Sequence, residues 1–200
     1  MDFLPVSKPL QPASRFNEWL YEAICPWLKG RVLEVNSGPD TISSIFLQRE
    51  RKVHLNSSDS EIRHYLSSKY KGKDVIRSVS QLDFRRPDFE EAYSEKHRVF
   101  DTILLLNSTQ NGGIDQVTVS HAKLLLQPRG RLIILAPARI AIFDGIDDNQ
   151  EEYKKYNRKE VHSLISDDME MLMTKYFILQ PSSSYPQVGL SVLAIARKIT

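Results

Sequence analysis

The sequence contains a single cysteine, Cys25, so it has neither an internal disulfide framework nor a multi-cysteine zinc site. Cys25 lies among Ala23, Ile24 and Trp27, and we expect a small buried apolar residue there rather than a nucleophile. The five histidines are isolated, with no H-x-x-x-H pair and no acid at ligand spacing. A metal site is therefore not expected.

Long apolar runs are also missing: none approaches the roughly 20 residues that a membrane-spanning helix needs. The first eight residues lack the basic start and apolar core of a secretory signal peptide, so we expect a cytoplasmic protein. Lysine and arginine total 27 against 25 acidic residues, for a net charge of +2. Because the basic residues are dispersed along the chain without interleaved stacking aromatics, a nucleic-acid partner is not expected.

Several catalytic motifs are absent. No serine lies in a G-x-S-x-G turn, and there is no G-x-x-x-x-G-K-[ST] loop, which argues against a hydrolase and a P-loop nucleotidase. A nicotinamide dinucleotide site would need G-x-G-x-x-G, of which only Gly38 is present.

The composition is that of an ordinary globular chain, with 41% apolar and 26% charged residues. We expect one domain over residues 1–200, of which residues 1–12, with three prolines, form an extended N-terminal arm. A helix capped by Ser14 or Asn17 should run to about Ile24, where Pro26 ends or kinks it.

The most informative stretch is 30–40, Gly-Arg-Val-Leu-Glu-Val-Asn-Ser-Gly-Pro-Asp. Its apolar run over 32–35 predicts a short buried strand, and the turn residues over 36–40 end that strand. Asp40 is placed to cap a following helix. The expected buried face of that helix consists of Ile42, Ile45, Phe46 and Leu47. A strand, a tight turn and a helix N-terminus together make a nucleotide-sized ligand site.

This stretch resembles the first motif, E-x-G-x-G-x-G, of the class I S-adenosylmethionine (SAM) dependent methyltransferases. Glu34 and Gly38 match the motif, whereas Asn36 and Asp40 stand where its first and third glycines belong. The resemblance implies an α/β fold, a Rossmann-like seven-stranded mixed sheet sandwiched by helices. It also implies that SAM lies over residues 36–40.

The other segments follow the order expected of that fold. Strands are predicted at 52–57, 74–79 and 99–107, followed by a turn and a fifth strand within 127–138 and two closing strands at 169–179 and 188–196. Asp115 should cap a helix whose apolar residues include Val119 and Leu124 to Leu126. The turn before the fifth strand resembles the family's Pro-Gly-Gly turn, with Gly130 kept and Arg129 in place of the first glycine.

Two family positions for the cofactor lie after the second and third strands. In the family, the second strand ends in an acid that binds the ribose hydroxyls, and alignment puts Ser57 at the position of that acid. Asp59 comes two residues late and is better explained as a helix cap. Asp83 matches the acid near the adenine amino group, although an aspartate in such a turn also bonds its own backbone.

The fourth strand should end at Asn107, a further cofactor-binding candidate by resemblance. The family then usually carries glutamate and histidine facing the methyl group, and here Gln110 and Asn111 stand at these two positions. They can form hydrogen bonds but cannot move protons near neutral pH, which makes them weak catalytic candidates.

Residues 143–161 resemble a segment of a methyltransferase subgroup associated with cell-surface polysaccharide or lipid-linked sugar pathways. The resemblance implies substrate-binding roles for Tyr153, Lys154, Lys155, Tyr156 and Arg158. The alternative is an exposed basic turn before a helix capped by Asn157.

Two hypotheses follow for function. In one, the fold is kept while the cofactor site is degenerate, giving a pseudo-methyltransferase that acts as a structural or regulatory partner of another protein. In the other, the chain is an active SAM-dependent methyltransferase on a small-molecule, sugar or lipid-linked acceptor, since methyl transfer to a reactive nucleophile depends mainly on positioning.

Overall fold

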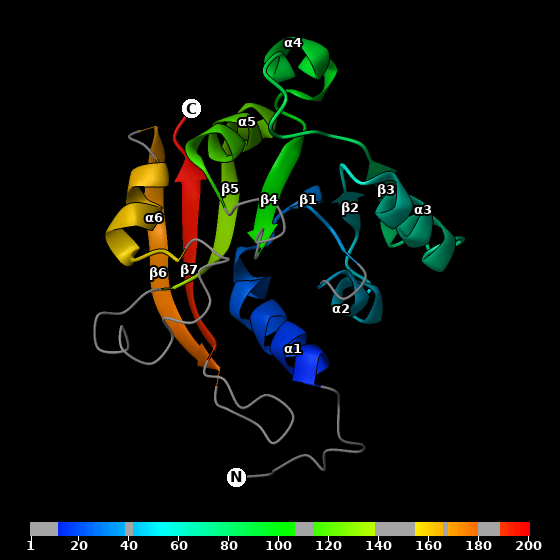
Figure 1. The fold of residues 1–200 in the computed structure, drawn as a ribbon, viewed down its shortest axis with the longest axis horizontal. Helices are drawn as coiled ribbons and strands as arrows, with labels where there is room; N and C mark the ends of the chain where they lie inside the picture. The colour runs from blue at the N-terminus through cyan, green and yellow to red at the C-terminus, as the bar shows by residue number, and fades with distance from the viewer. Residues whose placement is uncertain (1–11, 39–41, 107–113, 139–154, 166–167, 180–188) are drawn as a thin grey trace.

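The computed structural model describes residues 12–38, 42–106, 114–138, 155–165, 168–179 and 189–200 (Figure 1). The strands are β1 (Val32–Val35), β2 (Val53–Asn56), β3 (Ile76–Ser80), β4 (Phe100–Leu106), β5 (Leu126–Pro137), β6 (Met169–Leu179) and β7 (Gly189–Lys198). The α-helices are α1 (Pro12–Ile24), α2 (Ser43–Gln48), α3 (Ser60–Lys69), α4 (Phe89–Ala92), α5 (Gln116–Leu125) and α6 (Arg158–Leu164). Two short 3₁₀ helices, η1 (Cys25–Trp27) and η2 (Ser94–Lys96), complete the described elements.

The strands form one seven-stranded sheet in the order β3-β2-β1-β4-β5-β7-β6. Strands β1 to β5 are parallel, and β7 inserts antiparallel between β5 and β6. In Figure 1 the arrowhead of β7 and the C-terminus lie at the upper edge of the sheet, opposite the arrowheads of β4 and β6. The predicted mixed sheet with an antiparallel closing strand is confirmed.

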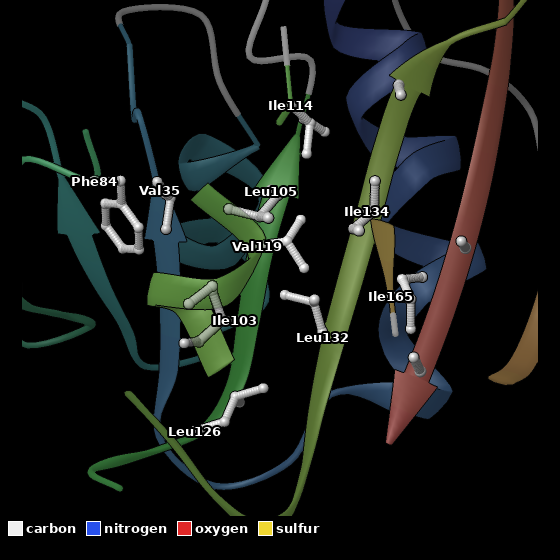
Figure 2. Close-up of a cluster of buried hydrophobic side chains, with 14 of the residues drawn as sticks. Val35, Phe84, Ile103, Leu105, Ile114, Val119, Leu126, Leu132, Ile134 and Ile165 are labelled. Carbon is white, nitrogen blue, oxygen red and sulfur yellow. The ribbon is translucent and has the colours of Figure 1, made fainter. Parts of the chain in front are cut away.

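Both faces of the sheet are covered, as the near-continuous apolar strands require. On one face α5, α4 and α6 pack over β1, β4, β5 and β7, and Figure 2 shows Val119 of α5 among Leu105, Leu132 and Ile134. On the other face α1, α2 and α3 pack over the same sheet, with Leu20 and Phe46 in the core. The expected sandwich of helices around a sheet is confirmed.

Two predicted helix starts were wrong. Helix α1 begins at Pro12, so Ser14 and Asn17 lie inside it rather than at its cap. Proline is favoured in the first turn because its missing N–H would have no partner there. Ile42, not Asp40, is at the N-cap of α2, and its carbonyl accepts the amides of Ile45 and Phe46 at 2.9 and 3.2 Å. Asp40 itself lies outside the described residues.

Three other predicted caps are confirmed. Asp59 Oδ1 accepts the amides of Glu61 and Ile62 at 2.7 and 3.0 Å at the start of α3. Asp115 caps α5, and Asn157 forms a reciprocal capping box with Glu160 on α6. Short polar side chains at these positions satisfy amides that have no partner within the helix.

The turn before the fifth strand differs from the prediction. Leu126 belongs to β5 rather than to α5, and the register of β5 against β4 shifts between the Phe100 and Thr102 pairs. Arg129 lies in this irregular stretch with φ of 61°. That is a left-handed conformation for which the family's glycine is better suited than arginine.

Two surface properties bear on function. None of the described helices is long and apolar enough to cross a membrane. Over the same part of the chain, no group of three or more potential ligands gathers as a metal site would require.

Cys25 is only partly buried, contrary to the prediction, because it lies in η1 at the rim of the core.

Candidate ligand site at the carboxyl edge of the sheet

The strand order reverses between β1 and β4. Strands β2 and β3 lie on one side of β1, while β4 and β5 lie on the other. Ligands of open α/β sheets bind at the carboxyl ends of the strands at such a switch point. The residues following β1, β2 and β3 are therefore the candidate site.

The loop after β1 adopts the conformation that the glycine motif would need. Asn36, which replaces the first glycine, has φ of 56°. Asparagine tolerates this left-handed region better than most residues, so the backbone path is kept. Glu34, which matches the motif acid, is 1% exposed in the middle of β1.

Ser37 fastens this loop to the end of β2. Its amide donates to the carbonyl of Asn56 at 2.7 Å, and its Oγ donates to the carbonyl of Glu34 at 3.1 Å. The amide of Asn56 in turn donates to Ser37 Oγ at 3.3 Å. The β1 loop is thus held against β2 by hydrogen bonds, with Gly38 following it half-buried.

Asn56 is the polar residue that the sequence analysis missed. It is 0% exposed at the last position of β2. Its Nδ2 donates to the carbonyl of Leu82 at 3.1 Å, and its Oδ1 accepts the amide of Leu82 at 2.6 Å. Ser80 Oγ donates to the same Oδ1 at 3.3 Å. The signal for it was a polar residue at the end of an apolar strand.

The residues beyond Asn56 are also engaged. Ser57 is 3% exposed, and its Oγ accepts the amide of Asp59 at 3.3 Å. The guanidinium of Arg63 donates to the carbonyls of Ser57 and Ser58 at 3.0 and 2.7 Å. A positive charge from α3 therefore lies at the end of β2, where the family has an acid.

Asp83 lies on the loop after β3 and is exposed. Its Oδ1 accepts the amide of Arg85 at 3.0 Å, and its own amide donates to Tyr93 Oη at 3.3 Å. The first contact is the local turn bond that aspartate commonly makes in loops. One carboxylate oxygen thus orders the loop, while the side chain remains at the edge of the site.

Two of the predicted substrate-binding residues make structural contacts. Tyr156 is 1% exposed, and its Oη donates to the carbonyl of Ile114 at 2.5 Å. The Arg158 guanidinium carbon lies 5.5 Å from the centre of the Tyr176 ring, and its amide donates to Tyr176 Oη at 2.9 Å. Lys155 is half-buried beside them.

Six predicted site residues lie outside the described residues, and their positions stay predictions. They are Asp40, Asn107, Gln110, Asn111, Tyr153 and Lys154.

The described residues can be compared with what SAM would need at the ends of β1 and β2. In the β1 loop Asn36 has a positive φ, which the motif's glycine would adopt easily. At the end of β2, Asn56 and Ser57 carry no charge, and Asp59 is a helix cap. Neither of these two residues at the end of β2 offers a carboxylate, which could accept two ribose hydroxyls, and the exposed carboxylate of Asp83 lies after β3 at the same edge.

No family model and no curated protein matches the sequence. Solved structures do resemble it. A candidate methyltransferase from Bacillus halodurans is 16% identical, with a TM-score of 0.68 over 92% of this chain and 99% of its own. A SAM-dependent methyltransferase from Methanosarcina mazei is 13% identical, with a TM-score of 0.65 over 90% and 98%. The [4+2]-cyclase SpnF is also 13% identical, with a TM-score of 0.65 over 92% and 80%.

These likenesses, together with the strand order, define the fold. The protein has the seven-stranded α/β fold of class I SAM-dependent methyltransferases. The cyclase among the similar structures illustrates that this fold supports chemistry other than methyl transfer.

Proposed function

We propose that this chain is a methyltransferase-fold protein with a degenerate cofactor site, which has weak or no catalysis and acts as a structural or regulatory partner of another protein. The observation that carries the proposal is the set of hydrogen bonds made by the residues at the carboxyl end of β2. Asn56 bonds the backbone of Leu82 in both directions, and Ser57 accepts the amide of Asp59. These polar groups serve the protein's own loops.

The energetic consequence is substantial. A charge-assisted hydrogen bond contributes about 1.5–3 kcal/mol. Losing one such bond to the ribose weakens affinity by about tenfold or more, because each 1.4 kcal/mol is a factor of ten. Arg63 beside Ser57 and Ser58 adds a cation at a position where the family uses an anion.

The catalytic candidates point the same way. Gln110 and Asn111 replace the glutamate and histidine that the resemblance implies. Amide side chains do not exchange protons near neutral pH, so general acid–base catalysis has no candidate at these two positions.

The second candidate function is an active methyltransferase on a small-molecule, sugar or lipid-linked acceptor. The observation that favours it is the φ of 56° at Asn36, which keeps the β1 loop in the form that the motif glycine would give. Positioning alone accelerates a transfer to an already reactive nucleophile.

Calorimetric titration with SAM and with its demethylated product tests the proposal. We expect no heat of binding at millimolar ligand from protein shown to be folded by circular dichroism. Micromolar binding of either ligand would overturn the degenerate site and support the enzyme.

A repair variant makes the test sharper. Ser57→Asp places a carboxylate at the β2 end, and Ser58→Asp, one residue on and exposed, adds the same charge as a control. If the missing acid is the defect, Ser57→Asp gains affinity for SAM by about tenfold or more, and Ser58→Asp does not. Equal behaviour of the two variants would contradict this explanation.

The partner role has its own test. Affinity purification of the tagged chain from its source organism should recover a defined protein at constant stoichiometry. Repeated recovery of the chain alone would count against a structural or regulatory role.

A further inference from the structure

The edge of the sheet opposite the candidate site gathers basic residues from distant parts of the sequence. This amino edge is formed by the segments that enter the parallel strands and by the end of β7, namely 28–31, 49–52, 71–75, 94–99, 127–131, 168–170 and 197–200. In Figure 1 the starts of β4 and β5 and the end of β7, with the C-terminus, lie at the top of the sheet.

Charge is unevenly divided between this edge and the rest of the chain. The amino edge holds thirteen lysines and arginines against five acidic residues, an excess of eight positive charges, whereas the whole chain carries +2. Its basic residues are Lys29, Arg31, Arg49, Arg51, Lys52, Lys71, Lys73, Lys96, Arg98, Arg129, Arg131, Arg197 and Lys198. The basic residues look dispersed in the sequence because the segments that enter neighbouring strands are far apart along the chain.

Three arginines at the centre of the edge are exposed. Arg31 precedes β1, Arg98 precedes β4 and Arg129 lies near the start of β5, on three adjacent strands. Their side chains form no ion pair with any residue that the structure describes. Asp101, just inside β4, accepts the backbone amide of Arg31 at 2.8 Å.

The basic groups also act on one another. Burial first, and then the charges of Arg31, Arg77 and Lys96, lower the pKa of His54 on β2. Burial first, and then mainly Arg98, lower the pKa of Lys198. The charges of Arg31, Lys96 and Arg98 thus act on neighbouring titratable groups, while Arg197 is compensated by its ion pair with Glu170.

Helix ends explain some of these cations but not the central ones. Arg49, Lys71 and Lys96 lie at or just after the ends of helices, where a positive charge stabilises the helix dipole. Arg31 and Arg129 do not directly follow a helix end. Arg98 and Arg129 have positive φ angles of 54° and 61°, a conformation that glycine adopts more easily than arginine.

We propose that the amino edge binds the phosphodiester backbone of a nucleic acid. The edge from β3 to β7 includes six strands, and five spacings of about 4.8 Å give a basic stripe about 24 Å long. A stripe of that length spans several consecutive phosphates. Seven of the thirteen cations are arginines, whose planar guanidinium matches phosphate geometry. Three of them are bonded within the protein, since Arg51 and Arg131 donate to backbone carbonyls and Arg197 pairs with Glu170. The exposed Arg31, Arg98 and Arg129 are therefore the ones that we assign to phosphate binding.

Other anionic partners fit less well. The large apolar side chains exposed in the described residues are Tyr65, Val117 and Ile199, of which Ile199 alone lies at this edge. Insertion into an anionic bilayer needs a broader apolar face, and a stable protein interface needs an apolar centre. A phosphate backbone needs neither.

The test is fluorescence anisotropy with labelled 20-nucleotide single-stranded RNA, single-stranded DNA and duplex DNA, at several salt concentrations. The test variant combines Arg31→Gln, Arg98→Gly and Arg129→Gly. The control combines Lys159→Gln, Lys175→Gln and Arg85→Gln, which removes the same charge from exposed positions elsewhere. Glycine suits the φ at 98 and 129, so we expect the test variant's Tm to stay at or above that of the wild type.

We expect wild-type binding at 50 mM salt, with affinity falling steeply as salt rises. The test variant should bind about tenfold or more weakly, with a salt slope smaller by about 2, and the control should bind as the wild type does. Absence of binding to all three probes would overturn the proposal. Equal weakening in both variants, or binding to phosphatidylserine vesicles but to no nucleic acid, would also overturn it.

Discussion

The side chain of Asn56 is hydrogen-bonded in both directions to the backbone of Leu82. Its Nδ2 donates to the Leu82 carbonyl at 3.1 Å, and its Oδ1 accepts the Leu82 amide at 2.6 Å. The amide side chain thereby continues the pairing of β2 with the chain leaving β3. A carboxylate at this position could accept the amide but could not donate to the carbonyl.

Asn56→Asp should accordingly destabilise the fold by about 2–4 kcal/mol at pH 7, because a charge is buried and the Leu82 carbonyl loses its donor. Urea unfolding monitored by circular dichroism measures the change. Ser58→Asp, at an exposed position nearby, is the control and should change stability little. A loss in Asn56→Asp no larger than in the control would contradict the role of this pair.

Gly30 and Asp101 give a second prediction. Gly30 has φ of 41°, and a Cβ there would lie 2.1 Å from Asp101 Oδ2. Gly30→Ala should therefore displace the carboxylate that accepts the Arg31 amide and lower stability by about 2 kcal/mol or more.

Gly72→Ala is the matched control for this change. Gly72 has φ of 74° but open space around its Cα, so alanine there should cost about 1 kcal/mol from backbone strain alone. Equal losses at the two glycines, compared by thermal unfolding, would show that the contact with Asp101 is unimportant.

Tyr156 should matter to the core rather than to an acceptor. Tyr156→Phe leaves the carbonyl of Ile114 without its 2.5 Å donor in a buried place, and we expect a loss of about 1–3 kcal/mol. Tyr176→Phe removes a hydroxyl that accepts the Arg158 amide at a partly exposed site, so its effect should be smaller. Chemical unfolding of both variants measures the two losses of stability. A larger loss in Tyr176→Phe than in Tyr156→Phe would contradict this prediction.

His54 predicts a pH dependence. Its pKa lies below the ordinary value because of burial, then Arg31, Arg77 and Lys96. The unfolded chain therefore binds the proton more readily, so this group's contribution to stability is complete above about pH 6.5 and declines as pH falls below it. In the variant His54→Gln, stability should fall less than in the wild type as the pH decreases below about 6.5.

Tm between pH 5 and 8 provides the measurement, and exposed His64→Gln is the control. Nuclear magnetic resonance titration adds an independent readout, since Arg31→Gln should raise the pKa of His54 by removing a positive charge. A pKa unchanged by that substitution would separate His54 from the amino edge.

Asp115 predicts a second loss of stability with falling pH, in a more acidic range. Burial acts to raise its pKa, but hydrogen bonds from Thr118 and the charge of Arg85 outweigh burial, and the pKa lies below its ordinary value. The folded state thus favours the carboxylate, whose contribution is present above the unfolded pKa and lost as pH falls below it.

Asp115→Asn tests the charge alone, because asparagine caps a helix about as well as aspartate. We expect a lower Tm than that of the wild type at pH 7 and a difference that shrinks below about pH 4. A difference independent of pH would mean that the charge contributes nothing.

The strands and the order of the fold could be predicted because apolar periodicity is a local signal. Strand β1 and the buried faces of α2 and α5 followed from residues such as Val35, Phe46 and Val119. The caps at Asp59, Asp115 and Asn157 followed from short polar side chains before apolar runs. The start of α1 was wrong, since proline at a first helical turn and proline in an extended arm look alike in sequence.

The candidate site was less predictable. That Asn36 tolerates a positive φ could be expected, and the structure has that conformation. The two bonds between Asn56 and Leu82 join residues 26 apart in the chain, and no pattern near Asn56 points to them. The reach of Arg63 back to Ser57 and Ser58 depends in the same way on how α3 packs beside β2.

The layered α/β fold follows from local sequence patterns, because the spacing of apolar and capping residues decides which elements form and which faces they bury. How the polar groups at the two edges of the sheet are used depends instead on which segments the fold brings together. At the carboxyl edge it committed Asn56 and Ser57 to neighbouring loops. At the amino edge it brought cations from separate segments onto adjacent strands, because strand order, not sequence order, determines which charges are neighbours.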